Sequence, residues 1–142
     1  MYKHLLLAID LADAEAQHKA VQSAIACCRS FGAQLSVITV VPDFGMSMVA
    51  GFFPKNYQQN ALKETDKALK AYAEKHFPED IQVHRIVAHG TIYREIIFHA
   101  EQCGCDLIVM ASHRPELEDY LLGPNAARVV RHAKASVLVV RD

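Results

Sequence analysis

The segment Leu5-Leu6-Leu7-Ala8-Ile9-Asp10 places five apolar residues in a row before a carboxylate. A short, unbroken apolar run is typical of a strand that helices cover on both faces, as in parallel sheets. Further apolar runs of strand length occupy residues 35–41, 81–88, 107–111 and 137–140. The sequence therefore predicts five strands, with the first at residues 5–9.

The stretches between these runs have the period of an amphipathic helix. In the first, residues 13–32, apolar residues fall at i, i+3, i+4 and i+7, namely Val21, Ala24, Ile25 and Cys28. Asp13 is the expected cap of this helix and Gly32 its expected stop. Residues 56–77, 91–104 and 124–133 repeat the pattern. Strict alternation of strands and helices predicts an α/β fold with a parallel, doubly wound sheet and helices on both faces.

The polarity of the strands indicates their order. Residues 81–88 mix His84 and Arg85 into the apolar run, which suits an edge strand. This favours the order 3-2-1-4-5 over the other common doubly wound order, 2-1-3-4-5. The fifth strand is then the opposite edge, yet Val137 and Val139 make it apolar. We expect it to pair with a second copy in a homodimer; cover by its own chain is the alternative.

Composition limits the class of protein. The chain has 142 residues, 15 basic against 16 acidic side chains and a net charge of −1. These values predict a single domain over residues 1–142 with no footprint for nucleic acid. No apolar run is long enough for a signal peptide or a membrane span, so we expect a cytoplasmic protein. The four cysteines fit no zinc or thioredoxin spacing, so we expect reduced, structural thiols and no metal site.

The predicted order places a crevice between the carboxyl ends of strands one and four, where ligands bind in open α/β sheets. Asp10 then faces Ser112, His113 and Arg114. Asp10 could accept hydrogen bonds from ribose hydroxyls or an amine, and Arg114 could neutralise phosphate. The alternatives are a helix-capping or turn carboxylate for Asp10 and a solvated loop arginine for Arg114. The predicted helix start at Gly123-Pro124-Asn125 would add a positive dipole end.

These C-terminal segments resemble the signature of the universal stress protein family. The similarity is greatest to its F-type branch, which reads ASHRP, a short spacer and YLLGSNAA. The matching segments are Ala111-Ser112-His113-Arg114-Pro115 and Tyr120-Leu121-Leu122-Gly123-Pro124-Asn125-Ala126-Ala127. The resemblance covers essentially the whole chain. It implies a cytosolic, dimeric stress-response protein that binds ATP, with or without Mg²⁺, in the same crevice.

The resemblance also implies site residues. Ala8 and Asp10 would line the adenosine site and Val40 would meet the adenine. The rest of the wall would come from Met110 and Ala111 and from Ser136, Val137 and Leu138. ATP-binding members carry G-x2-G-x9-G-[ST] in the loop before the last helix. Here Ala111, Arg114, Gly123 and Pro124 occupy those positions, with a spacer one residue shorter, and Asn125 or Arg114 would supply polar contacts to phosphate.

Two enzyme-like or signalling functions lack residues that they need. A phosphoreceiver needs an acceptor Asp after strand three and a Lys after strand five, and the chain has His89-Gly90 and Arg141-Asp142 there. A hydrolase would use Ser112, His113 and Asp10, but the G-x-S-x-G elbow is missing, so we expect no enzyme beyond slow ATP hydrolysis. A nucleotide-free homodimeric interaction protein remains the alternative. The long apolar linker at residues 42–54 is expected to pack or to form an interface rather than a lid.

Overall fold

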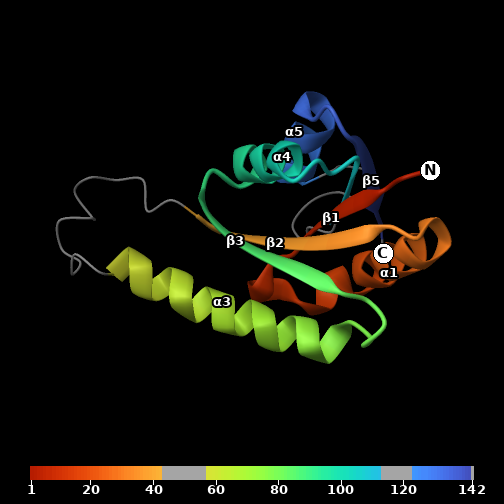
Figure 1. The fold of residues 1–142 in the computed structure, drawn as a ribbon. Coiled ribbons are helices and arrows are strands. Elements are labelled where there is room, and N and C mark those ends of the chain that lie inside the picture. The colour runs from red at the N-terminus through yellow and green to blue at the C-terminus, as the bar shows by residue number, and fades with distance from the viewer. Residues whose placement is uncertain (43–56, 113–122, 142) are drawn as a thin grey trace.

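The structure, a computed structural model, describes residues 1–42, 57–112 and 123–141 (Figure 1). Its centre is one parallel sheet with the strand order β3-β2-β1-β4-β5. The strands are β1 (His4–Ala8), β2 (Gln34–Pro42), β3 (Val83–Gly90), β4 (Leu107–Ala111) and β5 (Ser136–Val140). Both the fold class and the order 3-2-1-4-5 predicted from the sequence are confirmed.

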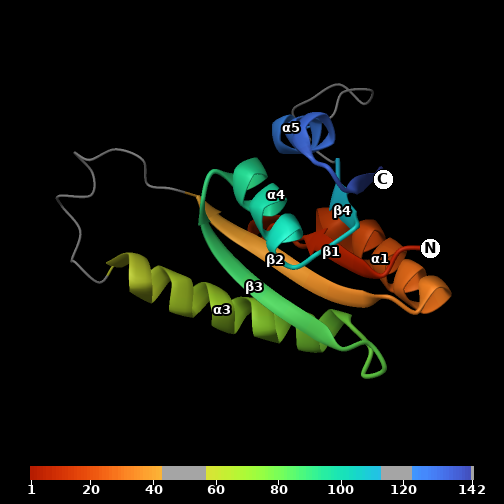
Figure 2. The same cartoon turned by 45° about the horizontal axis from the view of Figure 1, so that its top comes forward.

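Helices cover both faces of the sheet (Figures 1 and 2). On one face lie α1 (His18–Phe31) and α3 (Tyr57–His76), and on the other lie α4 (Ile92–Gln102) and α5 (Pro124–His132). Two short 3₁₀ turns, η1 (Leu11–Asp13) and η2 (Glu15–Gln17), join β1 to α1. The linker predicted at residues 42–54 lies outside the described residues, apart from Pro42 at the end of β2.

The core has two halves, and β1 contributes to both. Leu5, Leu6 and Leu7 all have 0% exposed surface. Successive side chains of a strand point to opposite faces, so Leu5 and Leu7 pack with α1 and α3 while Leu6 packs with α4 and α5. Burying one leucine side chain contributes about 1.5–3 kcal/mol. The unbroken apolar run is therefore what a central strand requires.

Asp106 forms hydrogen bonds to neighbouring strands at the amino-terminal edge of the sheet. Its carboxylate accepts hydrogen bonds from the backbone N–H groups of Lys3 (3.0 and 3.1 Å) and His4 (3.1 Å). Its own N–H donates to the His4 carbonyl (3.0 Å), and its carbonyl accepts from the Ser136 N–H (3.2 Å). One residue thus connects the starts of β1, β4 and β5 and supports the central pairing of β1 with β4.

Both ends of the third strand differ from the predicted bounds. The third strand begins at Val83, two residues later than predicted, and continues to Gly90. The cause is its pairing with β2, which extends from Leu35 opposite Val83 to Pro42 opposite Gly90.

None of the helices in the described segments is both long enough and apolar enough to cross a membrane.

Asp13 does not cap α1, so that prediction is wrong. Helix α1 begins at His18, and the 3₁₀ turns take up the residues between β1 and the helix. The capping contact belongs to Asp10, whose Oδ1 accepts from the Ala12 N–H at the first of these turns. Asp13 is left on the connection between the strand and the helix.

Candidate functional site

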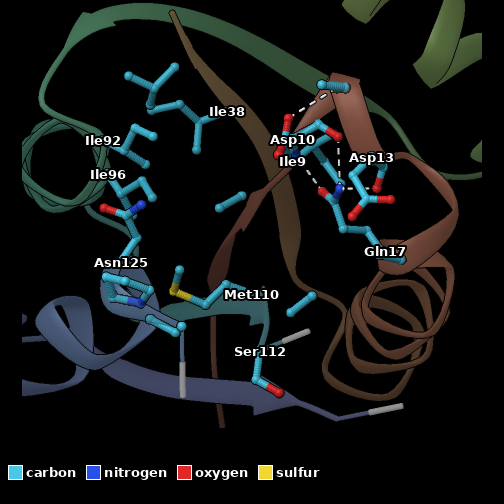
Figure 3. A pocket seen from close by; sticks show the side chains of 18 of the residues that line it. Ile9, Asp10, Asp13, Gln17, Ile38, Ile92, Ile96, Met110, Ser112 and Asn125 are labelled. Atoms are coloured by element: carbon cyan, nitrogen blue, oxygen red, sulfur yellow. Dashed lines mark hydrogen bonds between the residues drawn. The ribbon is translucent and has the colours of Figure 1, made fainter. Parts of the chain in front are cut away.

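A cleft opens at the carboxyl edge of the sheet between β1 and β4, where the strand order reverses (Figure 3). Its volume is about 360 Å³, at the lower end of the range of small-molecule sites. The lining residues come from the segment after β1 and from β2, α4, β4 and the start of α5. This is the position that the sequence predicted for a ligand.

The polar wall of the cleft is the segment between β1 and α1. Asp10, Asp13 and Gln17 line the cleft from this side (Figure 3). Asp10 Oδ1 accepts from the Ala12 N–H at 3.0 Å, so the capping alternative for Asp10 is confirmed together with its place in the cleft. An ionised carboxylate can only accept hydrogen bonds. This wall therefore suits ligand groups that donate, such as hydroxyls or an amine.

The opposite wall is apolar. Ile92 and Ile96 of α4 face the cleft together with Ile38 of β2 (Figure 3). Val40 and Met110 line it from β2 and β4. Apolar surface opposite a small polar group is the usual composition of a site for a flat, largely apolar ring with a polar attachment.

The start of α5 forms the third side. Gly123, Pro124, Asn125 and Ala126 line the cleft there, with Gly123 buried at the N-cap position. A helix start carries free backbone N–H groups and a positive dipole end, which favour phosphate or carboxylate. Pro124, the first residue of the helix, has no N–H to give. The remaining donors at this end are backbone groups and the Asn125 amide.

Ser112 also lines the cleft but is held by the sheet. It is buried, its N–H donates to the Val140 carbonyl at 3.1 Å, and its hydroxyl lies 3.5 Å from the same oxygen. A serine nucleophile needs a base within hydrogen-bond distance of its hydroxyl. Within the described residues, Ser112 has no such base. His113, which the hydrolase alternative would use, lies outside them.

The cleft brings together eight of the predicted site residues: Ala8, Asp10, Val40, Met110, Ala111, Gly123, Pro124 and Asn125. His113 and Arg114 lie outside the described residues. Ser136, Val137 and Leu138 do not line the cleft, contrary to expectation. In the parallel register Ser136 lies opposite Leu107, the first residue of β4, so this part of β5 is at or near the amino-terminal edge of the sheet.

The sequence did not predict Gln17, Ile92 or Ile96 as site residues, and it predicted Asp13 only as a helix cap. Gln17 had a detectable signal, since it lies four residues before Val21 and so falls on the apolar face of the helix predicted for residues 13–32. A polar residue on such a face is usually buried for a specific hydrogen bond. The two isoleucines carried no such signal because their spacing only indicated a buried helix face.

The residues of the cleft are compatible with a magnesium ion that arrives on a phosphate. Among the described residues there is no group of three or more His, Cys, Asp or Glu side chains that could hold a metal alone. Mg²⁺ is, however, usually held by one or two carboxylates together with substrate phosphates and water. Asp10 and Asp13 would be the protein ligands, and the ion would neutralise phosphate charge.

The cysteines take no part in the cleft. Burial raises the pKa of the Cys28 thiol to about 11 and that of the Cys105 thiol to about 12. Thiols with such pKa values stay protonated near neutral pH and are poor nucleophiles. Cys28 packs in the core beside α1 and Cys105 in the core beside α4, which confirms a packing role for these two residues.

A parallel sheet with helices on both faces defines a doubly wound α/β protein, and its cleft lies at the reversal of strand order, where proteins of this class bind ligands. The profile of the Universal stress protein family matches residues 1–141. The chain belongs to this family.

Relatives and solved structures agree with that assignment. Universal stress protein G of Shigella flexneri is 27% identical over 143 residues, which cover 99% of this chain and 100% of that protein. The structure of hypothetical protein MJ0577 superimposes with a TM-score of 0.78 at 29% identity, over 100% of this chain and 97% of that one. The structure of universal stress protein UspA from Lactobacillus plantarum superimposes with a TM-score of 0.75 at 20% identity, over 99% of this chain and 98% of that one.

Two of the similar structures are complexes. One is a universal stress protein with cAMP, with a TM-score of 0.61 and 22% identity over 99% of this chain and 97% of that one. The other is the universal stress protein from Archaeoglobus fulgidus with dAMP, with a TM-score of 0.64 and 16% identity over 97% of each chain. At these identities the likeness to this chain is one of fold.

Proposed function

We propose that this chain binds an adenine nucleotide, with ATP as the first candidate, in the cleft between β1 and β4. The observation that carries the proposal is the arrangement of its three sides, where Asp10 faces an apolar wall and α5 starts at the third side. A nucleotide combines the matching groups, namely hydroxyls, a flat ring and phosphate. The cAMP and dAMP complexes of similar folds support the same class of ligand.

Each side of the cleft has a part in this proposal. The ring lies against Val40 and the isoleucines, and the ribose hydroxyls donate to Asp10. The phosphates point toward Gly123 and the start of α5, with Arg114 as the predicted counter-charge. Mg²⁺ would join Asp10 and Asp13 to the phosphates.

The proposed role is regulatory rather than enzymatic. In the described part of the cleft no hydroxyl or thiol is paired with a base, since Ser112 lies next to a backbone carbonyl. Membership in the universal stress protein family supports a part in a stress response. We place this role in the cytoplasm, where the buried cysteines would stay reduced.

We also propose that the protein is a homodimer joined through β5. This strand is an edge of the sheet, and Leu138 is 36% exposed on it. An apolar edge strand has unpaired backbone groups that a second copy can pair with. Val137 and Val139, on the other face of the same strand, would lie at the symmetry axis or beside it.

The first test is to denature the purified protein and to analyse the released small molecules by chromatography. Adenine nucleotide near one per chain is the expected result. No released nucleotide, together with no thermal shift on addition of Mg-ATP, would instead support the nucleotide-free interaction protein.

The second test is the variant Asp10→Asn, measured by titration calorimetry with ATP. The amide oxygen can still accept from Ala12, but the group that faces the ligand becomes a donor. Hydrogen bonds to a charged group contribute about 1.5–3 kcal/mol, so we expect affinity to fall by roughly 10- to 100-fold. The control is Asp80→Asn, because Asp80 lies away from the cleft in a pair with Arg29. Equal losses in both variants would remove Asp10 from the site.

A further inference from the structure

The side chain of Gln17 is buried and fully used in hydrogen bonds to the segment after β1. It has 5% exposed surface. Its Oε1 accepts from the Asp10 N–H, and its Nε2 donates to the Asp10 carbonyl at 2.7 Å and to the Asp13 carbonyl at 2.6 Å. A primary amide has two N–H donors. Both are therefore engaged, and both hold the backbone that carries the two cleft carboxylates (Figure 3).

This amide takes the place of a neighbouring strand. The pairing of β1 with β2 ends where the Ile9 N–H donates to the Ile38 carbonyl at 2.8 Å. At the next residue, Asp10, the N–H and the C=O both bond to the Gln17 amide. A planar side-chain amide offers the same donor and acceptor as a peptide group. Gln17 thus supplies a hydrogen-bond partner to both the N–H and the C=O of Asp10, one residue beyond the last β1–β2 hydrogen bond.

The consequence concerns the direction of the Asp10 carboxylate. Its backbone is fixed by Gln17, and its Oδ1 accepts from the Ala12 N–H at 3.0 Å. With its backbone N–H and C=O already bonded to Gln17, the group that Asp10 offers to a ligand is its carboxylate. Preorganised acceptors of this kind bind more tightly because less conformational freedom is lost on binding.

We propose that Gln17 is a positioning residue that acts on the ligand through Asp10. It sets the direction of the carboxylate and keeps Asp13 on the same wall. This inference rests on the proposed nucleotide site for its effect on affinity. Its structural part, the clamp on the Asp10 peptide, does not depend on any ligand.

The test uses two variants of the full chain with a matched control. Gln17→Met keeps the length of the side chain but removes all three hydrogen bonds, and Gln17→Glu keeps an acceptor but has no donors when ionised. We expect ATP affinity to fall by roughly tenfold in both, which is the effect of about one net hydrogen bond or slightly more. Gln22→Met is the control, since Gln22 is an exposed residue of α1, the helix that follows Gln17.

A double-mutant cycle separates positioning from a general structural effect. If Gln17 acts through Asp10, then Asp10→Asn with Gln17→Met binds ATP no more weakly than Asp10→Asn alone. Losses that multiply in the double variant, or wild-type affinity in Gln17→Met, would overturn the inference. The circular dichroism spectrum tests whether each variant is folded. If Gln17→Met does not fold, Gln17→Glu replaces it in the double-mutant cycle.

Hydrogen exchange of the Asp10 amide tests the clamp without a ligand. We expect exchange to be roughly tenfold faster in Gln17→Met, because the N–H loses its acceptor, and unchanged in Gln22→Met. Unchanged Asp10 exchange in Gln17→Met would overturn the clamp even if nucleotide binding is confirmed. Failure of the wild-type protein to bind nucleotide would overturn the proposed function and the affinity effect, and it would leave the clamp to be judged by this measurement.

Discussion

At the scale of single residues, the surroundings of an aspartate decide what it does. Asp10 is held by one N–H at Oδ1 and faces a cleft. Asp106 is used by the fold itself, since backbone N–H groups of His4 and Lys3 donate to its carboxylate and hold the pKa of this carboxyl below its ordinary value. The first carboxylate is thus open to a ligand, whereas the second stabilises the junction of β1 and β4.

The lowered pKa of Asp106 predicts a dependence of stability on pH. Because the pKa is lower in the folded than in the unfolded chain, the stabilisation is fully present above the unfolded value of about 3.9. It is lost as the pH falls through the folded value. We expect Asp106→Asn to lower the urea midpoint of unfolding near neutral pH, and the difference from wild type to shrink under acid conditions.

Asp80→Asn is the control for this measurement. The hydrogen bond from Arg29 lowers the pKa of the Asp80 carboxyl as well. This pair is exposed, with side-chain surface fractions of 54% and 60% for Arg29 and Asp80, so solvent screens it and its contribution is small. A difference between Asp106→Asn and wild type that stays constant with pH would contradict the assignment.

At the scale of elements, α3 shows how one helix is attached to the sheet. Its long polar surface leaves Leu69 and Tyr72 as its buried anchors, both in the core beside α1. Leu69 has 0% exposed surface. The element is therefore fixed by a few apolar side chains, at a distance from the residues that line the cleft.

This attachment predicts the effect of Leu69→Ala. Removal of a fully buried leucine side chain costs about 2–5 kcal/mol of unfolding free energy, which urea unfolding followed by circular dichroism would measure. Lys70→Ala, an exposed neighbour, should stay within about 0.5 kcal/mol of wild type. Because α3 does not line the described cleft, ATP affinity of the folded variant should not change. A loss of affinity in Leu69→Ala would show that α3 shapes the site.

The elements also show where sequence patterns suffice. The helix at residues 56–77 was predicted within one residue at each end, because Pro78 stops it and its apolar period is regular. The start of α1 was predicted too early, because Asp13 is a residue type that often caps helices, whereas two 3₁₀ turns precede the helix here. The start of β3 depended on its register with β2, which is a contact between distant residues.

At the scale of the whole molecule, the two edges of the sheet differ. The β3 edge is flanked by α3 and carries exposed His84 and Arg85. The β5 edge is apolar and includes the exposed Leu138. The asymmetry gives the protein one edge suited to association and one that resists it.

This asymmetry predicts how charge affects association. We expect Leu138→Asp or Val139→Asp to turn the proposed dimer into a monomer, because a carboxylate would be buried between two copies. Sedimentation velocity would measure the change. His84→Asp on the opposite edge is the control and should sediment as the wild type does. An unchanged profile for both β5 variants would contradict a dimer through this strand.

The amino-acid pattern alone was enough to predict the fold class, the strand order and the edge of the sheet where a ligand would bind. These follow from local patterns, since apolar runs and helical periods state which faces are covered. The same pattern predicted Asp10 and Gly123 at the cleft, where both lie. Asp10 directly follows the first predicted strand, and Gly123 directly precedes the last predicted helix.

How those residues are held depends on the folded molecule and could not be predicted from the pattern. That Gln17 clamps the Asp10 peptide, that Asp106 joins three strands, and that Ser136 is far from the cleft all depend on contacts between separate elements. The polar residue Gln17 on an apolar face could be detected in the sequence, but the partners of such hydrogen bonds could not, because they are set by register and by the packing of helices against the sheet.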